Sequence, residues 1–252
     1  MSRELTSAAR ERYRKQVILP MVGEEGQRKL LSSKALVIGA GGLGSPAAMY
    51  LVSCGVGTVG LVDGDDLELS NLHRQVLYST GDVDKPKIAL AEKRLKEINP
   101  DTDIRTYKLR AGRDNINGLI EGYDVVLDCS DNFETKYMLN DSCVSAEKAL
   151  VHGGIYASEG QLTFILPGGK PCYRCLFPEL PAPGSFRDCR QAGILGSVPG
   201  VIGTLQATEA IKYLMGAGKV LSGRLLRYDA FTGNIKISEF KQDNKCPACG
   251  GG

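Results

Sequence analysis

A glycine-rich segment followed by an acid gives the first chemical signal in this chain of 252 residues. Residues 39–44 read GAGGLG, directly after the apolar run 35–38 and before the helix-compatible stretch 45–52. Glycines in this setting permit a tight turn and a close approach of backbone to phosphate, and the N–H groups of a helix start favour an anion. Asp63 ends the next apolar run, at the distance expected of an acid that binds ribose. The pattern predicts a nucleotide site; the alternative is a tight turn without a ligand.

Four cysteines form two C-x-x-C pairs, Cys172 with Cys175 and Cys246 with Cys249. Each pair can present two thiolates from one turn, and two such turns complete a tetrahedral zinc site. The long gap between the pairs means that the fold must bring them together. A redox pair at Cys246 and Cys249 is one alternative, but such pairs normally sit at a helix N-terminus, for which the sequence after Cys249 leaves little room. Unligated cysteines are the other.

Helical and strand patterns alternate through the first part of the chain, as in βαβ repetition, and later strands favour antiparallel pairing. We therefore predict an α/β fold with a Rossmann-like, mostly parallel sheet, continued by an antiparallel part and ending in a zinc-clipped C-terminus. The expected helices are 8–18, 24–31, 45–52, 87–98, 133–147 and 201–215, and the expected strands are 35–38, 58–62, 104–109, 123–128, 149–152, 161–166, 223–229 and 234–240.

The overall composition is that of an ordinary globular protein, with 42% hydrophobic and 24% charged residues. A net charge of +2 does not suggest a nucleic-acid partner. No apolar run has the length of a membrane span, and the N-terminus lacks the apolar core of a signal peptide. We expect a cytoplasmic protein with no membrane partner, in which the 8 cysteines serve as metal ligands, nucleophiles or core residues rather than disulfides.

Taken together, the motifs resemble those of the E1-like adenylyltransferases, the ThiF/MoeB/HesA family that activates ubiquitin-like sulfur carrier proteins. The resemblance covers nearly the whole chain. It rests on these segments: RYRKQ at 12–16, the glycine loop, 63–75, DKPK at 84–87, DCSDN at 128–132, both C-x-x-C pairs, and CRQAG at 189–193.

This resemblance implies an enzyme that joins the α-phosphate of ATP to the C-terminal glycine of a Gly-Gly carrier and releases pyrophosphate. The chain has no G-x-x-x-x-G-K-[ST] loop, so Arg74 and Lys87 are the expected phosphate ligands. Asp131 matches the Mg²⁺-binding acid, and Asp63 should hold the ribose. The plainer alternatives are that Arg74 is a surface arginine, that Lys87 is a surface lysine at a helix start, and that Asp131 is a helix N-cap. Further residues expected to line the site are Gly39, Gly41, Gly42, Gly44, Asp65, Asn71, Gln75 and Asn132.

The N-terminal motif of this chain departs from the family pattern at Lys15. The family's second N-terminal arginine reaches ATP phosphates of the neighbouring subunit, whereas this chain has Lys15 there, which keeps the charge but loses the bidentate fork. We expect Lys15 to act in trans within a homodimer. Cys189 lies between Arg187 and Arg190, which can lower a thiol's pKa. It matches a cysteine that forms an acyl link with the carrier in the thiamin branch; the alternative is a loop cysteine without a catalytic role.

The resemblance further implies one E1-like adenylation domain over residues 1–252. It would comprise N-terminal helices (1–33), a nucleotide-binding half (34–166) and a carrier-binding and zinc half (167–252). Residues 177–200 are rich in Pro, Gly and polar residues, a composition that predicts a mobile loop there. The sulfur would come from a separate donor protein. The sequence leaves open whether the pathway is thiamin, molybdopterin, cysteine or tRNA thiolation. Alternative functions are an NAD-dependent oxidoreductase, an adenylating enzyme of the tRNA threonylcarbamoyladenosine dehydratase type, and a non-catalytic nucleotide-binding relative.

Overall fold

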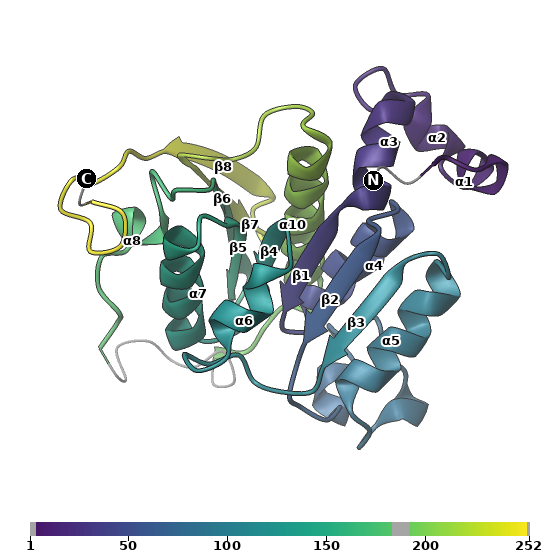
Figure 1. Cartoon of the computed structure of the whole chain (residues 1–252). Coiled ribbons are helices and arrows are strands. Elements are labelled where there is room, and N and C mark those ends of the chain that lie inside the picture. The colour runs from purple at the N-terminus through teal and green to yellow at the C-terminus, as the bar shows by residue number, and fades with distance from the viewer. Residues whose placement is uncertain (1–3, 183–191, 251–252) are drawn as a thin grey trace.

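One eight-stranded sheet runs through the protein, as seen in the computed structural model, which describes residues 4–182 and 192–250 (Figure 1). The strands are β1 (Lys34–Ile38), β2 (Thr58–Val62), β3 (Asp103–Tyr107), β4 (Val125–Asp128), β5 (Ala149–Tyr156), β6 (Glu159–Ile165), β7 (Arg224–Asp229) and β8 (Asn234–Glu239).

The sheet has a parallel part and an antiparallel part, in the order β3-β2-β1-β4-β5-β6-β7-β8. Strands β1 to β5 pair in parallel, and β5 to β8 form an antiparallel meander. The predicted fold class is therefore confirmed. Because β1 leads to β2 on one side and lies against β4 on the other, the strand order reverses between β1 and β4. In open α/β sheets this switch point is where ligands bind, at the carboxyl ends of the strands.

Helices cover both faces of the sheet (Figure 1). They are α1 (Ser7–Arg12), α2 (Arg14–Val17), α3 (Gly23–Ser32), α4 (Gly44–Ser53), α5 (Lys87–Ile98), α6 (Ile116–Glu121), α7 (Phe133–Ser145), α8 (Tyr173–Leu176) and α10 (Ser197–Met215), with short 3₁₀ turns η1 (Leu69–Asn71) and η2 (Thr80–Asp82). No helix among residues 4–182 and 192–250 is both long and apolar enough to cross a membrane.

Alternation along the buried strands divides the core into two layers. Successive side chains of a strand point to opposite faces. In β1, Ala35 and Val37 accordingly pack in the cluster that includes side chains of α4 and α10, and Leu36 and Ile38 pack with α6 and α7. All four side chains are at most 3% exposed, which explains why this strand reads as a continuous apolar run.

The structure differs from the sequence-based prediction at several element boundaries. The predicted helix 8–18 is broken at Tyr13, whose ring is buried and whose hydroxyl accepts a hydrogen bond from Asn99 Nδ2 at 2.8 Å. Helix α10 begins at Ser197 rather than Val201, because Pro199 is tolerated in a first turn. The last residues of the predicted loop at 177–200 are thus helical, and residues 183–191 of it lie outside the described residues. Helix α6 was not predicted.

Candidate functional site

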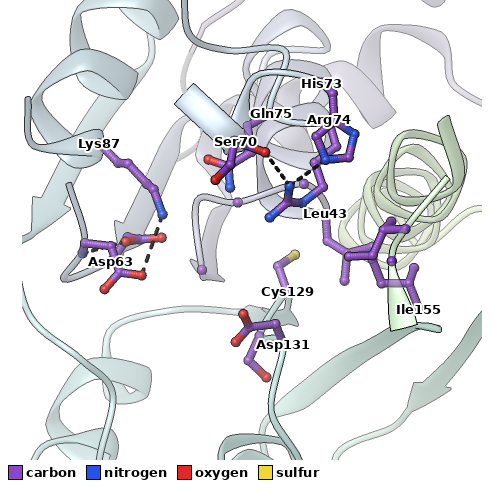
Figure 2. Close-up of a pocket in the computed structure, with 17 residues that line it drawn as sticks. Leu43, Asp63, Ser70, His73, Arg74, Gln75, Lys87, Cys129, Asp131 and Ile155 are labelled. Carbon is purple, nitrogen blue, oxygen red and sulfur yellow. Dashed lines mark hydrogen bonds and ion pairs between the residues drawn. The ribbon is translucent and has the colours of Figure 1, made fainter. Parts of the chain in front are cut away.

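A pocket of about 390 Å³ opens at the carboxyl ends of β1, β2, β4 and β5, over the switch point of the sheet (Figure 2). Loops that follow β1, β2 and β4 supply most of its wall, and Ile155 of β5 contributes from within the strand. The lining residues are Gly39, Gly41, Gly42, Leu43, Asp63, Asp65, Ser70, His73, Arg74, Gln75, Lys87, Cys129, Ser130, Asp131, Ile155, Gly193 and Ile194.

The glycine loop is shaped by close backbone contacts. Gly39 has a φ of +96°, and a Cβ there would lie 2.7 Å from the carbonyl oxygen of Cys129. A Cβ on Gly44 would lie 1.8 Å from the carbonyl oxygen of Gly39. Both positions therefore require glycine. Gly44 supports the loop from the start of α4 and does not line the pocket. Among the described residues no side chain caps the N-terminus of α4; Ser45 N donates to the carbonyl oxygen of Gly41 at 2.9 Å and Pro46 has no N–H, so the helix start favours an anion chiefly through its partial positive charge.

Asp63 connects the glycine loop to the end of β2. Its Oδ2 accepts a hydrogen bond from Ala40 N at 2.8 Å, and its Oδ1 accepts one from Asp65 N at 2.9 Å. The hydroxyl of Tyr78 donates to the carbonyl oxygen of Ala40 at 2.8 Å and holds the same residue from its other side. Burial raises the pKa of Tyr78, so this phenol stays protonated and serves as a donor. The carboxylate is thus fixed where a ribose could reach it.

Lys87 brings a buried ammonium group to the pocket. The residue is 6% exposed, and its Nζ lies 3.6 Å from Asp65 Oδ2. Asp65 also accepts a hydrogen bond from Arg110 Nη2 at 2.8 Å. Burial alone would raise the pKa of Asp65, but the hydrogen bond from Arg110 and the charge of Lys87 hold that pKa below its ordinary value. A phosphate could therefore replace Asp65 as the partner of Lys87 while Asp65 keeps Arg110.

Arg74 and Gln75 lie on the pocket wall that follows η1. Arg74 Nη1 donates to the carbonyl oxygen of Ser70 at 3.0 Å and lies 2.7 Å from His73 Nε2. Asn71 is buried and does not line the pocket; it accepts a hydrogen bond from Glu68 N and thereby shapes η1. Gln75 is 4% exposed, and its Oε1 has no hydrogen-bond partner among the described residues. The wall thus offers a ligand the guanidinium group of Arg74, held by Ser70, and the buried Oε1 of Gln75, which has no partner among the described residues.

Asp131 lies across the pocket from Arg74, beyond the end of β4 (Figure 2). Its side chain is exposed, and it makes no hydrogen bond or ion pair to any described residue. The N-cap of α7 is the next residue, Asn132, whose side chain accepts a hydrogen bond from Thr135 N at 2.9 Å. The N-cap alternative for Asp131 is therefore wrong. Asn132, which was predicted to line the site, caps the helix and does not line the pocket.

Lys15 and Cys189 were also predicted to serve this pocket. Lys15 is exposed on α2 and does not line it. Cys189 lies outside the described residues. Conversely, sequence reasoning did not assign Leu43, Ser70, Cys129, Ser130, Ile155, Gly193 or Ile194 to the site. Leu43, Ser70 and Ser130 are neighbours of predicted residues, so chain proximity was an available signal. Ile155 and Ile194 have no such signal, because β5 runs past its predicted end and Ile194 bridges Ala157 from a distant segment.

The two C-x-x-C pairs meet, as the zinc prediction requires. All four sulfur atoms lie within 4.8 Å of one another, with 3.6 Å between Cys172 and Cys246 and 3.4 Å between Cys175 and Cys249. Zinc–sulfur bonds of about 2.3 Å in a tetrahedron place the sulfurs about 3.8 Å apart, so the set could bind zinc. N–H groups of Asn140 and Asp243 point at Cys172 Sγ and Cys175 Sγ, at 3.7 and 3.5 Å, as is usual around thiolates.

Known proteins are similar to this chain in sequence and in fold. The model of the ThiF family matches residues 13–250. The chain is 46% identical over 252 residues to the SAMP-activating enzyme E1 of Haloferax volcanii, covering 100% of this chain and 93% of that protein. It is 47% identical over 245 residues to the sulfur carrier protein adenylyltransferase of Thermus thermophilus, covering 95% and 90%.

Among solved structures, E. coli MccB determined with ATP has the same fold. It superposes with a TM-score of 0.84 at 23% identity, covering 95% of this chain and 75% of that chain. The family model spans almost all of the chain. The alignments with the H. volcanii and T. thermophilus enzymes cover at least nine tenths of this chain and of each enzyme. The resemblance found in the sequence motifs is therefore confirmed. The chain belongs to the ThiF family.

Proposed function

We propose that this protein uses ATP and Mg²⁺ to adenylate the C-terminal glycine of a ubiquitin-like sulfur carrier protein with a Gly-Gly end. The observation that carries the proposal is the pocket at the switch point, which gathers Asp63, Arg74, Lys87 and Asp131 around one glycine loop. The close relatives named as a sulfur carrier protein adenylyltransferase and a SAMP-activating E1 support the same reaction. We further propose that the chain acts as a single adenylation domain in the cytoplasm.

The nucleotide is proposed to lie along the pocket from Asp63 to the glycine loop. Asp63 would accept hydrogen bonds from the ribose hydroxyls. The triphosphate would meet the N-terminus of α4 together with Arg74 and Lys87, while Gln75 Oε1 would accept a hydrogen bond from a ligand or its water. Mg²⁺ is usually bound by one or two carboxylates together with phosphate oxygens, and the carboxylate of Asp131, which has no partner among the described residues, could serve this purpose. When bound, Mg²⁺ would neutralise charge on the phosphates.

The chemistry needs charge neutralisation more than proton transfer. The glycine carboxylate is already ionised at neutral pH, so it can attack the α-phosphorus without a general base. A carboxylate oxygen–phosphorus bond forms, the bond from the α-phosphorus to the bridging oxygen breaks, and pyrophosphate leaves with that electron pair. Two anions must approach each other in this step. Arg74 and Lys87 would offset their repulsion and stabilise charge in the transition state.

A surface on the β7–β8 hairpin is proposed as the carrier-binding site. Phe231, Ile235 and Ile237 are 79%, 61% and 50% exposed, and β8 is the edge strand of the sheet. Ile235 and Ile237 are two residues apart on a strand and so share one face. An exposed apolar patch beside an open strand edge is typical of a protein-binding surface. It belongs to the half of the chain for which carrier binding was predicted.

The second subunit and the metal complete the proposal. We propose a homodimer in which Lys15 reaches the phosphates of the partner subunit; the exposed apolar side chains of Ile18, Leu19 and Met21 next to α2 suit a subunit interface. The four-cysteine cluster would hold a structural zinc ion with no open coordination position. A separate protein would deliver sulfur to the adenylate, for thiamin or molybdopterin synthesis, and Cys189 stays a predicted acyl acceptor.

Carrier-dependent exchange of pyrophosphate into ATP tests the proposal. We expect exchange with an intact Gly-Gly carrier and none with a carrier that lacks its last glycine. Ile237→Asp should raise the carrier concentration for half-maximal exchange at least about tenfold without changing the KM for ATP, since it affects one binding surface. The matched control is Lys236→Ser, on the other face of β8. Exchange without carrier, or with the truncated one, would contradict the proposed substrate.

A further inference from the structure

A buried cluster of ionisable side chains lies behind the pocket wall. Asp128 and His152 are 0% exposed and Lys136 is 6% exposed, and none of the three lines the pocket. Asp128 ends β4, its register partner on β5 is His152, and Lys136 lies on α7. Burying an ion pair is costly, and an apolar group of similar size would often stabilise the fold as well or better. The cluster therefore calls for an explanation beyond packing.

Lys136 provides the positive charge of the cluster. Its Nζ lies 3.3 Å from Asp128 Oδ2 and donates a hydrogen bond to the carbonyl oxygen of Gly153 at 2.6 Å. His152 Nδ1 is 2.8 Å from Asp128 Oδ2, but neither ring nitrogen has a well-directed hydrogen bond to any residue that the structure describes. Burial lowers the pKa of His152, which leaves the ring neutral. Lys136 thus connects α7 to both β4 and β5.

Asp128 extends these contacts to the turn that carries Asp131. Its Oδ1 accepts hydrogen bonds from Ser130 N at 3.1 Å and Ser130 Oγ at 2.6 Å. Burial alone would raise the pKa of Asp128. The charge of Lys136 and the hydrogen bond from Ser130 nevertheless hold that pKa below its ordinary value, so the carboxylate of Asp128 stays ionised. The residue on the other side of Asp131, Asn132, is fixed as the N-cap of α7. Asp131 lies between two anchored neighbours, although its own carboxylate has no partner among the described residues.

We propose that Asp128 and Lys136 are positioning residues that hold residues 129–131 so that Asp131 faces the pocket. Without the ammonium group, the buried carboxylate would lose its counter-charge and the turn its fixed anchor. Asp131 would then have to be ordered when the metal–nucleotide complex binds, and that ordering costs free energy. This inference rests on the proposed function, in which Asp131 binds Mg²⁺ together with ATP.

The test is the effect of Mg²⁺ on ATP affinity, measured by titration calorimetry of the full chain with and without the metal. In the unaltered protein Mg²⁺ should tighten ATP binding. Lys136→Met should reduce this tightening about tenfold, the equivalent of one hydrogen bond to a charged group. Lys136→Arg should restore most of it. Ser130→Ala, which removes only the 2.6 Å bond, should give a smaller loss and serves if Lys136→Met does not fold.

Lys148 provides the matched control at the opposite end of α7. Its Nζ donates to the carbonyl oxygens of Glu121 and Tyr123, at 2.7 and 2.9 Å, far along the sheet from Asp131. Lys148→Met should lower stability and leave the Mg²⁺ effect unchanged. The inference would be overturned if Mg²⁺ tightened ATP binding as much in Lys136→Met and Ser130→Ala as in the unaltered protein. It would also be overturned if Mg²⁺ did not tighten ATP binding in the unaltered protein. These measurements need no carrier, so a normal Mg²⁺ result without carrier-dependent exchange would refute only the proposed function.

Discussion

The carboxylate of Asp63 accepts a hydrogen bond from the backbone N–H of Ala40 at 2.8 Å, which fixes the end of β2 to the glycine loop after β1. Ala40 is held again through its carbonyl oxygen by Tyr78. The acid proposed for the ribose and the loop proposed for the phosphates therefore form one rigid unit before any ligand binds. Such preorganisation lowers the ordering cost of binding.

Asp63→Asn should weaken ATP binding by about tenfold or more, because a neutral acceptor replaces a charged one at the ribose. The sharper readout is the ratio of affinities for ATP and 2′,3′-dideoxy-ATP. In the unaltered protein the missing hydroxyls should cost affinity, and in Asp63→Asn most of that difference should disappear. Asp66→Asn, at an exposed acid outside the pocket, is the control. An equal ratio in both variants and the unaltered protein would contradict the ribose role.

Lys87→Ala should lower the rate of pyrophosphate exchange about a hundredfold, since one charged donor to the developing phosphate charge is lost. Asp65 would keep its bond to Arg110 in this variant, so the fold around β2 should be retained. Lys85→Ala removes an exposed lysine two residues away and should leave the rate unchanged. A rate within twofold of normal for Lys87→Ala would show that this ammonium group does not serve the reaction.

The four-cysteine cluster should hold one zinc ion per chain, measured by mass spectrometry of the metal content. Cys249→Ser should lose the ion and lower the free energy of unfolding by about 4 kcal/mol or more, because loss of a structural metal is among the most destabilising changes. Cys54→Ser alters a cysteine outside the cluster and should retain the zinc. A purified chain that contains no zinc after growth with the metal would refute the assignment.

Stability should fall on acidification because of His152. Burial lowers its pKa in the folded state below the value of about 6.5 expected after unfolding. Below about pH 6.5 the unfolded chain therefore takes up a proton that the folded chain does not, and stability is lost as the pH falls. Between pH 7.5 and pH 5.5 this single site lowers the free energy of unfolding by at most about 1.4 kcal/mol.

Denaturant unfolding at the two pH values measures this loss. His152→Gln should reduce the loss of stability between pH 7.5 and pH 5.5. His73→Gln, at the exposed second histidine of the chain, should leave the loss unchanged. The other titrating groups contribute equally in the variants and in the unaltered protein. If His152→Gln and the unaltered protein lose the same free energy, His152 is not the group responsible.

The parts of the site that follow from local chemistry could be predicted from the sequence. Gly39 is required by its positive φ and Gly44 by its approach to the carbonyl oxygen of Gly39, both within one strand–turn–helix unit, and Asp63 directly follows the next strand. The glycine pattern and its spacing were therefore sufficient. The fold class followed from the alternation of elements, since parallel strands need helical crossovers. Arg74 and Lys87 required the family resemblance, because nothing in their local sequence distinguishes a phosphate ligand from a surface cation.

The remaining features depend on contacts between distant segments. The pairing of Asp128 with His152 depends on strand register, which the sequence did not reveal. Ile194 reaches the pocket only because it bridges Ala157. The break at Tyr13 arises where the ring meets Asn99, and that tertiary contact outweighs the local helical pattern. The part proposed for Lys15 depends on a second subunit, which no pattern within one chain describes.

Direct detection of the adenylated carrier tests the central claim most directly. The protein would be mixed with ATP, Mg²⁺ and a Gly-Gly carrier, quenched in acid, and the intact carrier weighed by mass spectrometry. We predict a carrier heavier by one AMP with the unaltered enzyme, and little or none with Asp131→Ala or with a carrier that lacks its last glycine. ATP consumption that leaves the carrier mass unchanged, or AMP on the truncated carrier, would contradict the account.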